Sequence, residues 1–435
     1  MTCACSASAS KSADRELRRN FTLGVFNGAA FQLGESLIDP SVVLTWFVSH
    51  LTASNFLIGL VVPLGDAGWF LPQLLFSARI QQMERKMPVY GLFALIRIIA
   101  WTILAATVWW VDEPHLLLLA FFVLYAVARL ASGPCGLAFF DIVARVIPPQ
   151  RRGTFFGWRQ LVGGILGLGG GWIVRTVLNC PRLPFPRGHA TLFAMYALIL
   201  IPALGSFTLV KEPPGKARQA NMQRQFIWAA RVLVSNGPYR DYLLARMTMI
   251  LSSIAIPFYT VYARNVLGAI EGMAGIYVSA RLGAQLLSNL PWGRMSDRRG
   301  NRLVMKLLAL GNALTPLLAL TLMGVVAVCR LRGPWLPYLA LPIFLLDGLM
   351  RPAHMLAGSN FLLEMAPEGE RSLYLGLSNS LLGIVILASG FGGLIVDWLG
   401  LASLFAISAV LCAIGYLLVL RLPEPREMAK DAPAS

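Results

Sequence analysis

The stretch GRMSDRRGNR, residues 293–302, separates two long apolar segments, 270–292 and 303–328. Each apolar segment is long enough to cross a bilayer as a helix, so the stretch between them is predicted to form a tight basic turn at a membrane face. Gly293 permits a close approach of two helices, and Asp297 can accept hydrogen bonds from the N-terminus of a neighbouring helix. The arginines hold the turn on the cytoplasmic side of the membrane.

This pattern resembles the Gly-x-x-x-Asp-Arg-x-Gly-Arg-Arg loop of the major facilitator superfamily, although an asparagine replaces the first terminal arginine. That family consists of secondary transporters with twelve membrane helices. The resemblance implies an all-α membrane protein with two pseudo-symmetric six-helix bundles. It also implies a gating loop made of Gly293, Asp297, Arg298, Gly300 and Arg302. An ordinary basic loop is the alternative, but the two glycines and the aspartate at these offsets favour the family's loop.

The composition of the whole chain agrees with a multi-pass membrane protein. Its 435 residues are 57% hydrophobic and only 13% charged, and the mean hydropathy is +0.65. These values exclude a soluble domain of ordinary composition. A helix needs about 20 apolar residues to cross a bilayer. The sequence predicts twelve such spans: 21–49, 55–78, 88–110, 115–143, 154–178, 189–210, 242–264, 270–292, 303–328, 335–362, 373–396 and 401–420.

The placement of the charges explains the net charge of +16. Most of the lysines and arginines fall on one side of the predicted membrane if the N-terminus is cytoplasmic, as the positive-inside rule requires. We therefore expect both termini in the cytoplasm, a location in the cell (inner) membrane, and no nucleic-acid partner. Residues 1–20 are polar, and the first apolar segment is too long for a cleaved signal peptide.

The chain divides into two halves. We predict a disordered cytoplasmic tail at 1–20, an N-terminal bundle at 21–210, a cytoplasmic connector at 211–240, a C-terminal bundle at 241–421 and a second tail at 422–435. The connector contains a basic amphipathic stretch around residues 226–234, which predicts a short helix at the membrane interface. A shift of 216 residues places Gln81 opposite Asp297, so the first half lacks the acid of the gating loop.

Glycines recur at four-residue spacing in the fifth span, at Gly163, Gly167 and Gly171. Small residues at this spacing let two helix backbones approach closely. A sliding contact between the two halves and simple tight packing are both compatible with the pattern.

Ionisable residues at mid-span carry the functional prediction. Placing a charge there costs about 2.5–3.5 kcal/mol on insertion scales, so each needs a partner or a hydrated cavity. The residues are the acids Glu35, Asp39, Asp66 and Asp347 and the bases Arg97, Arg129, Arg281 and Arg351. Their equal numbers make structural ion pairs the competing explanation. In the resembled fold the first, fourth, seventh and tenth helices line the central cavity.

The candidates for proton coupling are Glu35, Asp39 and Asp66. Glu35 and Asp39 are four residues apart, so they project from one face of the first helix, and Glu35 is the leading candidate. Pro40 disfavours helical geometry at Asp39. Asp39 as a helix cap is the alternative explanation. We also expect Asp66 to pair with Arg281 across the two halves.

The candidates for substrate binding are Arg129, Asp347, Arg351, His354, Tyr125 and Tyr259. Arg129 has no acid nearby on its own helix, which suits a carboxylate or phosphate of the substrate. Asp347 and Arg351 are four residues apart, so an ion pair within the helix is the alternative for these two.

Two further arginines, Arg159 and Arg246, lie near predicted helix ends. We expect their side chains to extend toward the membrane surface.

These features predict proton-coupled secondary transport of a small organic anion or zwitterion by an alternating-access monomer. One alternative is an exporter of amphipathic, lipid-like or drug-like compounds. Another is a non-transporting membrane protein that assembles or delivers a cofactor. The sequence has no nucleotide-binding loop of the Gly-x-x-x-x-Gly-Lys-Ser/Thr type, so ATP is not expected to drive it. We expect no enzymatic activity, no cofactor and no metal, and free thiols at Cys180 and Cys329.

Overall fold

The computed structural model describes the backbone of residues 2–215, 231–367 and 370–424, and these ranges are helical without any strand. Residues 2–215 form six helical rods. They are α1 (Thr2–Leu37) continued by η1 (Pro40–Leu44) and α2 (Thr45–Leu51), then α3 (Asn55–Gln81), α4 (Met87–Trp110), α5 (Pro114–Val146), α6 (Pro149–Leu178) and α7 (Arg187–Thr208).

Six further rods follow. They are α9 (Gly237–Leu251) continued by η2 (Ser252–Ala255) and α10 (Ile256–Asn265), then α11 (Met273–Arg299), α12 (Asn301–Val328), η3 (Leu336–Ala340) with α13 (Leu341–Met365), α14 (Arg371–Ser389) and α15 (Gly392–Arg421). The predicted all-α class is therefore confirmed.

Nine helices in the described ranges are long and apolar enough to cross a membrane. The other rods contain α1, α11 and α14. The first two of these carry charged residues along their length, and the apolar part of α14 is short.

Gly400 divides α15 into two helical segments. Its φ of +81° interrupts the helical backbone inside α15, in the left-handed region that glycine adopts without strain. The segment before it packs on the start of α3, where Asn55 Nδ2 donates to Asp397 Oδ1 at 2.7 Å. The predicted boundary between the spans 373–396 and 401–420 falls at this break.

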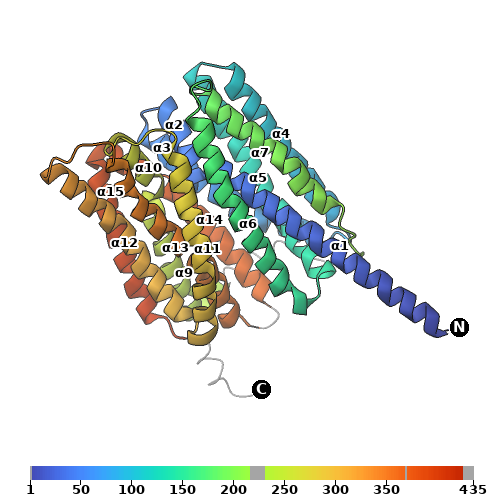
Figure 1. Ribbon diagram of the computed structural model, residues 1–435. Helices are drawn as coiled ribbons and strands as arrows, with labels where there is room; N and C mark the ends of the chain where they lie inside the picture. Colours follow the sequence, from blue (N-terminus) through green and yellow to red (C-terminus); the bar gives the residue numbers. More distant parts are fainter. Residues whose placement is uncertain (1, 216–230, 368–369, 425–435) are drawn as a thin grey trace.

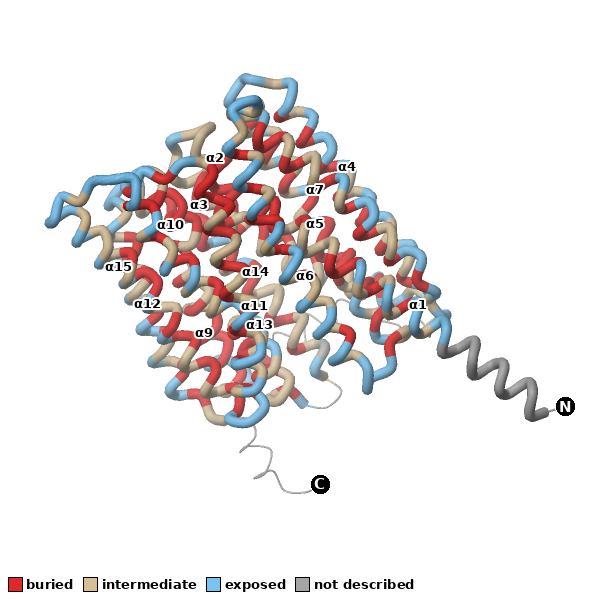
Figure 2. The backbone as a smooth tube through the Cα atoms, viewed as in Figure 1, coloured by how far each residue is buried: buried red, intermediate tan, exposed pale blue. Residues whose placement is uncertain are grey.

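The rods form two bundles that lie side by side (Figure 1). In the first bundle α1 packs on α6 and α7, and α5 packs on α3 and α4. In the second, α13 packs on α11 and α12, and α12 also packs on α15. Figure 2 shows that buried residues gather where the rods of a bundle face one another. The bundles contact each other through α6 with α11 and through α3 with α14.

Two glycines, one from each bundle, make a close contact between the bundles. A Cβ atom at Gly275 of α11 would overlap the carbonyl oxygen of Gly171 of α6. Gly163 instead faces Gln32 of α1, whose Cβ would lie 2.9 Å from a Cβ added at that glycine. The glycine stripe of α6 therefore serves both predicted purposes, since Gly163 allows packing within a bundle and Gly171 allows contact between bundles.

Hydrogen bonds join the bundles at the end of the molecule opposite the chain termini, which we call the outer end. There Thr260 Oγ1 donates to the carbonyl of Ser41 at 2.7 Å, and Arg264 Nη1 donates to the carbonyl of Ser49 at 2.7 Å. Toward the termini, Gly157 of α6 has no neighbour within 4 Å of a Cβ position, and Gly293 of α11 has none either. In Figure 1 the backbones of α6 and α11 diverge in this direction, whereas the hydrogen bonds of Thr260 and Arg264 join the bundles at the outer end.

The first connector residues are bound to the N-terminal bundle. The Glu212 carboxylate accepts hydrogen bonds from the backbone N–H groups of Lys86 and Met87, each at 2.8 Å, at the N-terminus of α4. Arg145 Nη1 lies 3.2 Å from the same carboxylate. Burial lowers the pKa of the Lys86 ammonium, and the Asp141 carboxylate opposes this effect. An acid from the connector thus binds beside the loop in which Gln81 replaces the expected aspartate.

The predictions for the two tails and for the amphipathic stretch have different outcomes. The backbone of α1 is helical from Thr2, which differs from the disordered tail expected at 1–20. Most of the amphipathic stretch at 226–234 and most of the tail at 422–435 lie outside the described residues.

Candidate functional site

The mid-span charges form two groups, and the first lies entirely within the N-terminal bundle. Glu35 of α1 stands at its centre. Arg129 Nη1 lies 3.0 Å from Glu35 Oε2, and Arg97 Nη2 lies 3.6 Å from Oε1. The Tyr196 hydroxyl donates to Oε1 at 2.5 Å. Arg129 therefore already has a carboxylate partner, which the sequence did not reveal because the two residues come from different helices.

The second group crosses between the bundles. Arg281 of α11 donates through Nη1 to Asp39, the N-cap of η1, and through Nε to Asp347 of α13, the latter at 2.5 Å. The Arg281 side chain is 4% exposed and that of Asp39 is 7% exposed. We call Asp39, Arg281 and Asp347 the charge bridge. It joins a buried guanidinium of one bundle to a carboxylate of the other.

Asp39 caps a helix, as the alternative explanation predicted, and it also binds Arg281. Its Oδ1 accepts from the backbone N–H groups of Ser41 and Val42, at 3.0 and 3.2 Å, and so caps η1. Its Oδ2 accepts from Arg281. The helix break before Pro40 holds the carboxylate toward the second bundle.

Asp66 of α3 is not the partner of Arg281, which corrects the expected pair. It is partly buried, and it has no ion pair within the described part of the chain. It lies near enough to Arg281 and Tyr125 to act on both electrostatically. Two carboxylates bind the Arg281 guanidinium and Asp66 is a third nearby, so the carboxylates outnumber this guanidinium.

The alternative explanation for Asp347 and Arg351, an ion pair within the helix, is not found, because Asp347 binds Arg281 instead. Gly348 allows this approach, since a Cβ there would overlap the carbonyl of Arg281. Arg351 is exposed and has no ion pair among the described residues. His354 turns toward α12, where its Nε2 lies 3.0 Å from Asn312 Nδ2.

The two tyrosine candidates lie inside the bundles. Tyr125 is fully buried and stacks on Phe121, with ring centroids 5.2 Å apart. Tyr259 is 4% exposed and stacks on Phe405 of α15, with centroids 5.3 Å apart. Both rings contribute to packing within their bundles, and their assignment to substrate contact stays a prediction.

Arg159 and Arg246 both turn inward instead of extending to the membrane surface. Arg159 Nη1 donates to the carbonyl of Gly24 at 2.6 Å and to Asn27 Oδ1 at 2.9 Å. Arg246 of α9 is 8% exposed, and its Nε and Nη1 are buried without a hydrogen-bond partner. Sequence reasoning missed this residue.

The predicted gating loop is a one-residue turn. Helix α11 runs to Arg299, Gly300 has a φ of +82°, and α12 begins at Asn301. Ser296 Oγ donates to Asn301 Oδ1 at 2.6 Å, so the asparagine that departs from the family pattern stabilises the turn. Arg302 donates to the carbonyl of Leu420 at 2.8 Å. Asp297 and Arg298 lie in the last turn of α11.

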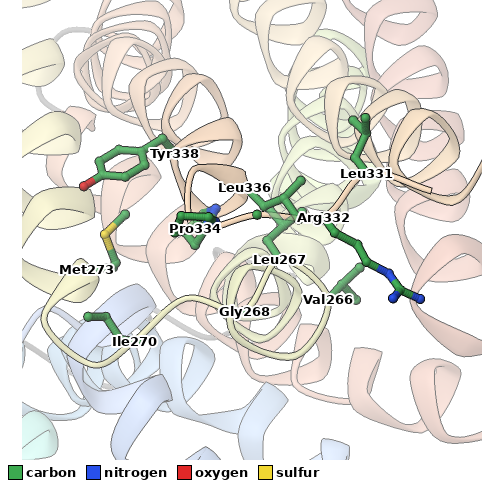
Figure 3. Close-up of a pocket in the computed structure, with 12 residues that line it drawn as sticks. Val266, Leu267, Gly268, Ile270, Met273, Leu331, Arg332, Pro334, Leu336 and Tyr338 are labelled. Atoms are coloured by element: carbon green, nitrogen blue, oxygen red, sulfur yellow. The ribbon is translucent and has the colours of Figure 1, made fainter. Parts of the chain in front are cut away.

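The described residues include no group of three or more histidine, cysteine or carboxylate side chains that could hold a metal. Cys180 and Cys329 are free thiols, as expected. A pocket of about 520 Å³ lies at the outer end, between residues 266–273 and 331–338 (Figure 3). None of the mid-span charges lines this pocket.

Residues 241–435 match the sequence model of the Major Facilitator Superfamily. The whole chain is similar in structure to a D-xylose-proton symporter, with a TM-score of 0.73 and 14% identity over 94% of this chain and 98% of that one. It is similar to a mutant of the nucleoside transporter NupG, with a TM-score of 0.72 and 15% identity over 93% and 99% of the two chains. A POT family transporter in complex with 5-aminolevulinic acid gives a TM-score of 0.66 and 13% identity over 95% and 96%. No curated protein matches the chain in sequence.

Proposed function

We propose that this chain, which has the major facilitator fold throughout and the family's sequence in its second half, is a proton-coupled transporter of a small organic anion or zwitterion. It is not an enzyme, and it works by alternating access. The observation that carries the proposal is the charge bridge, because it joins the two bundles at the helix break of α1.

A bridge between bundles suits a protein whose bundles move relative to each other. The bond between Arg281 and Asp39 can persist only while the outer end is closed, because the neighbouring contact of Ser41 with Thr260 closes that same end. A ligand can shift such an equilibrium only through a difference in its affinity for the two states. A proton or a substrate that competes for a residue of the charge bridge would bind with different affinity to the two states, because the bridge is intact in only one of them.

Asp66 is the proposed proton site, in place of Glu35. Glu35 is held as a carboxylate by two guanidinium groups and a hydroxyl, so a proton would have to displace these partners. Asp66 has no such partner among the described residues and lies near Arg281. A proton on Asp66 would reduce the excess negative charge around Arg281 and so change how strongly Arg281 attracts its other partners.

The decisive test is uptake into proteoliposomes that contain the purified chain. A panel of labelled carboxylates, phosphates, zwitterions, neutral solutes and amphipathic compounds is offered with and without an imposed proton gradient. We expect accumulation of an anion or zwitterion only with the gradient. Equal uptake with and without the proton gradient would refute proton coupling. Movement of amphipathic compounds alone would favour an exporter, and no flux of any class would favour the non-transporting alternative.

A further inference from the structure

We infer that Arg246 of α9 and Arg351 of α13 bind the anionic group of the transported substrate. This inference rests on the proposed function and names the site for its substrate class. It differs from the sequence expectation, in which Arg129 had this role.

Arg246 is a buried cation without a carboxylate partner. It is 8% exposed, no acid among the described residues lies within ion-pair distance, and Nε and Nη1 are buried without a hydrogen-bond acceptor. The buried arginines Arg97 and Arg281, in contrast, each face at least one carboxylate. A buried charge is retained at a cost to stability unless a partner compensates it. The missing partner of Arg246 is an anion.

The structure leaves room for this guanidinium at one position of α13. A Cβ atom at Gly358 would lie 2.5 Å from Arg246 Nη2, so a larger residue would displace the side chain. Tyr242, one turn before Arg246, donates to the carbonyl of Gly358 at 2.8 Å and stacks on Phe361. The side chains of α9 and α13 therefore meet around Arg246.

Arg351 supplies a second cation from the same region. Arg246 lies against Gly358 of α13, and Arg351 is seven residues before Gly358, which is two turns along the same face of that helix. Arg351 is exposed and has no ion pair among the described residues. It is one helical turn from Asp347 on the same face of α13, and Asp347 belongs to the charge bridge. Arg351 thus lies one turn from the charge bridge, on an exposed part of α13.

The chemistry of the two side chains defines the ligand class. A planar guanidinium donates two parallel hydrogen bonds to a carboxylate or phosphate, and two guanidiniums compensate one oxyanion more fully than one. An oxyanion here would give Arg246 its missing acceptor. We therefore assign the site to a carboxylate or a phosphate group, with Arg351 at the exposed side and Arg246 at the buried side.

The test measures thermal stability and binding of the purified full chain with succinate, inorganic phosphate and neutral mannitol. We expect one of the two anions to stabilise the chain in a saturable way, which also identifies carboxylate or phosphate as the preferred group. Arg351→Gln should weaken this binding about tenfold or more, the effect of losing a charged hydrogen bond. Arg332→Gln, on the outer surface, is the matched control and should bind as the original chain does.

Arg246→Met separates binding from folding. Because it removes a buried charge without a partner, it should raise the melting temperature without ligand and abolish stabilisation by the anion. A lower melting temperature with unchanged anion binding would overturn the inference, and so would no saturable effect of either anion on the original chain. Anion binding that needs both arginines, without flux in proteoliposomes, would instead refute only the proposed function. If both variants transport the anion as fast as the original chain does, only this binding site is refuted.

Discussion

Replacing Asp39 with asparagine should shift the protein toward the state that is open at the outer end. The bond of Asp39 Oδ2 with Arg281 crosses between the bundles, whereas that of Asp347 with Arg281 stays within the second bundle. Asparagine keeps an oxygen that can cap η1 but removes the charge. A hydrogen bond to a charged group contributes about 1.5–3 kcal/mol, so the ratio of outer-open to outer-closed molecules should rise about 10- to 150-fold.

A pair of spin labels at the outer end can measure this ratio. One label is placed at Asp112→Cys, in the exposed turn after α4, and the other at the exposed native Cys329 after α12, with the remaining cysteines replaced by serine. Asp39→Asn should increase the population at long distances. Asp347→Asn, the matched control, disturbs the same guanidinium within one bundle and should leave the distance distribution unchanged. Equal shifts in both variants, or none in either, would refute the argument.

Three further outcomes are expected. Asp66→Asn should abolish accumulation driven by a proton gradient yet allow exchange of substrate across proteoliposomes, and full accumulation in this variant would exclude Asp66 as the proton site. Glu35→Gln leaves Arg97 and Arg129 buried without a carboxylate, so it should lower the free energy of unfolding by roughly 3 kcal/mol. A normal melting curve together with transport that no longer depends on pH would instead assign the proton site to Glu35. Asp297→Asn should change the distance distribution of the same label pair while the melting temperature stays constant, and an unchanged distribution would argue against a gating role for this loop.

The fold could be predicted because the length of each apolar segment determines where a membrane helix can lie. The tail shows where this reasoning fails. Its alanine- and serine-rich sequence has no apolar pattern, yet the helical backbone of α1 begins at Thr2. Alanine has the highest helix propensity, so a helix can continue beyond the segment that the membrane requires.

The sequence identified which charges matter, but not which of them pair. The cost of burying a charge singles out Asp39, Asp66 and Asp347 by depth alone. Which acid reaches Arg281 depends on how each helix is rotated and on the break at Pro40, and neither is encoded by repeat alignment. Arg246 was misplaced for a simpler reason. Helix α9 begins at Gly237, before the predicted span, so Arg246 lies about 14 Å along the helix at 1.5 Å per residue.

The contact of Gly171 with Gly275 is a point about which α6 can rotate relative to α11. The helix extends from this contact to Pro149, about 33 Å at 1.5 Å per residue, and a rotation of about 10° about the contact would move that end by about 6 Å. The side chains of Ser279 and Arg175 flank this contact, and the two glycines let the backbones meet between them. A methyl group at Gly275 would overlap the carbonyl oxygen of Gly171 and force the two helices apart. The variant Gly275→Ala is therefore a means of trapping the outer-open form for structural study.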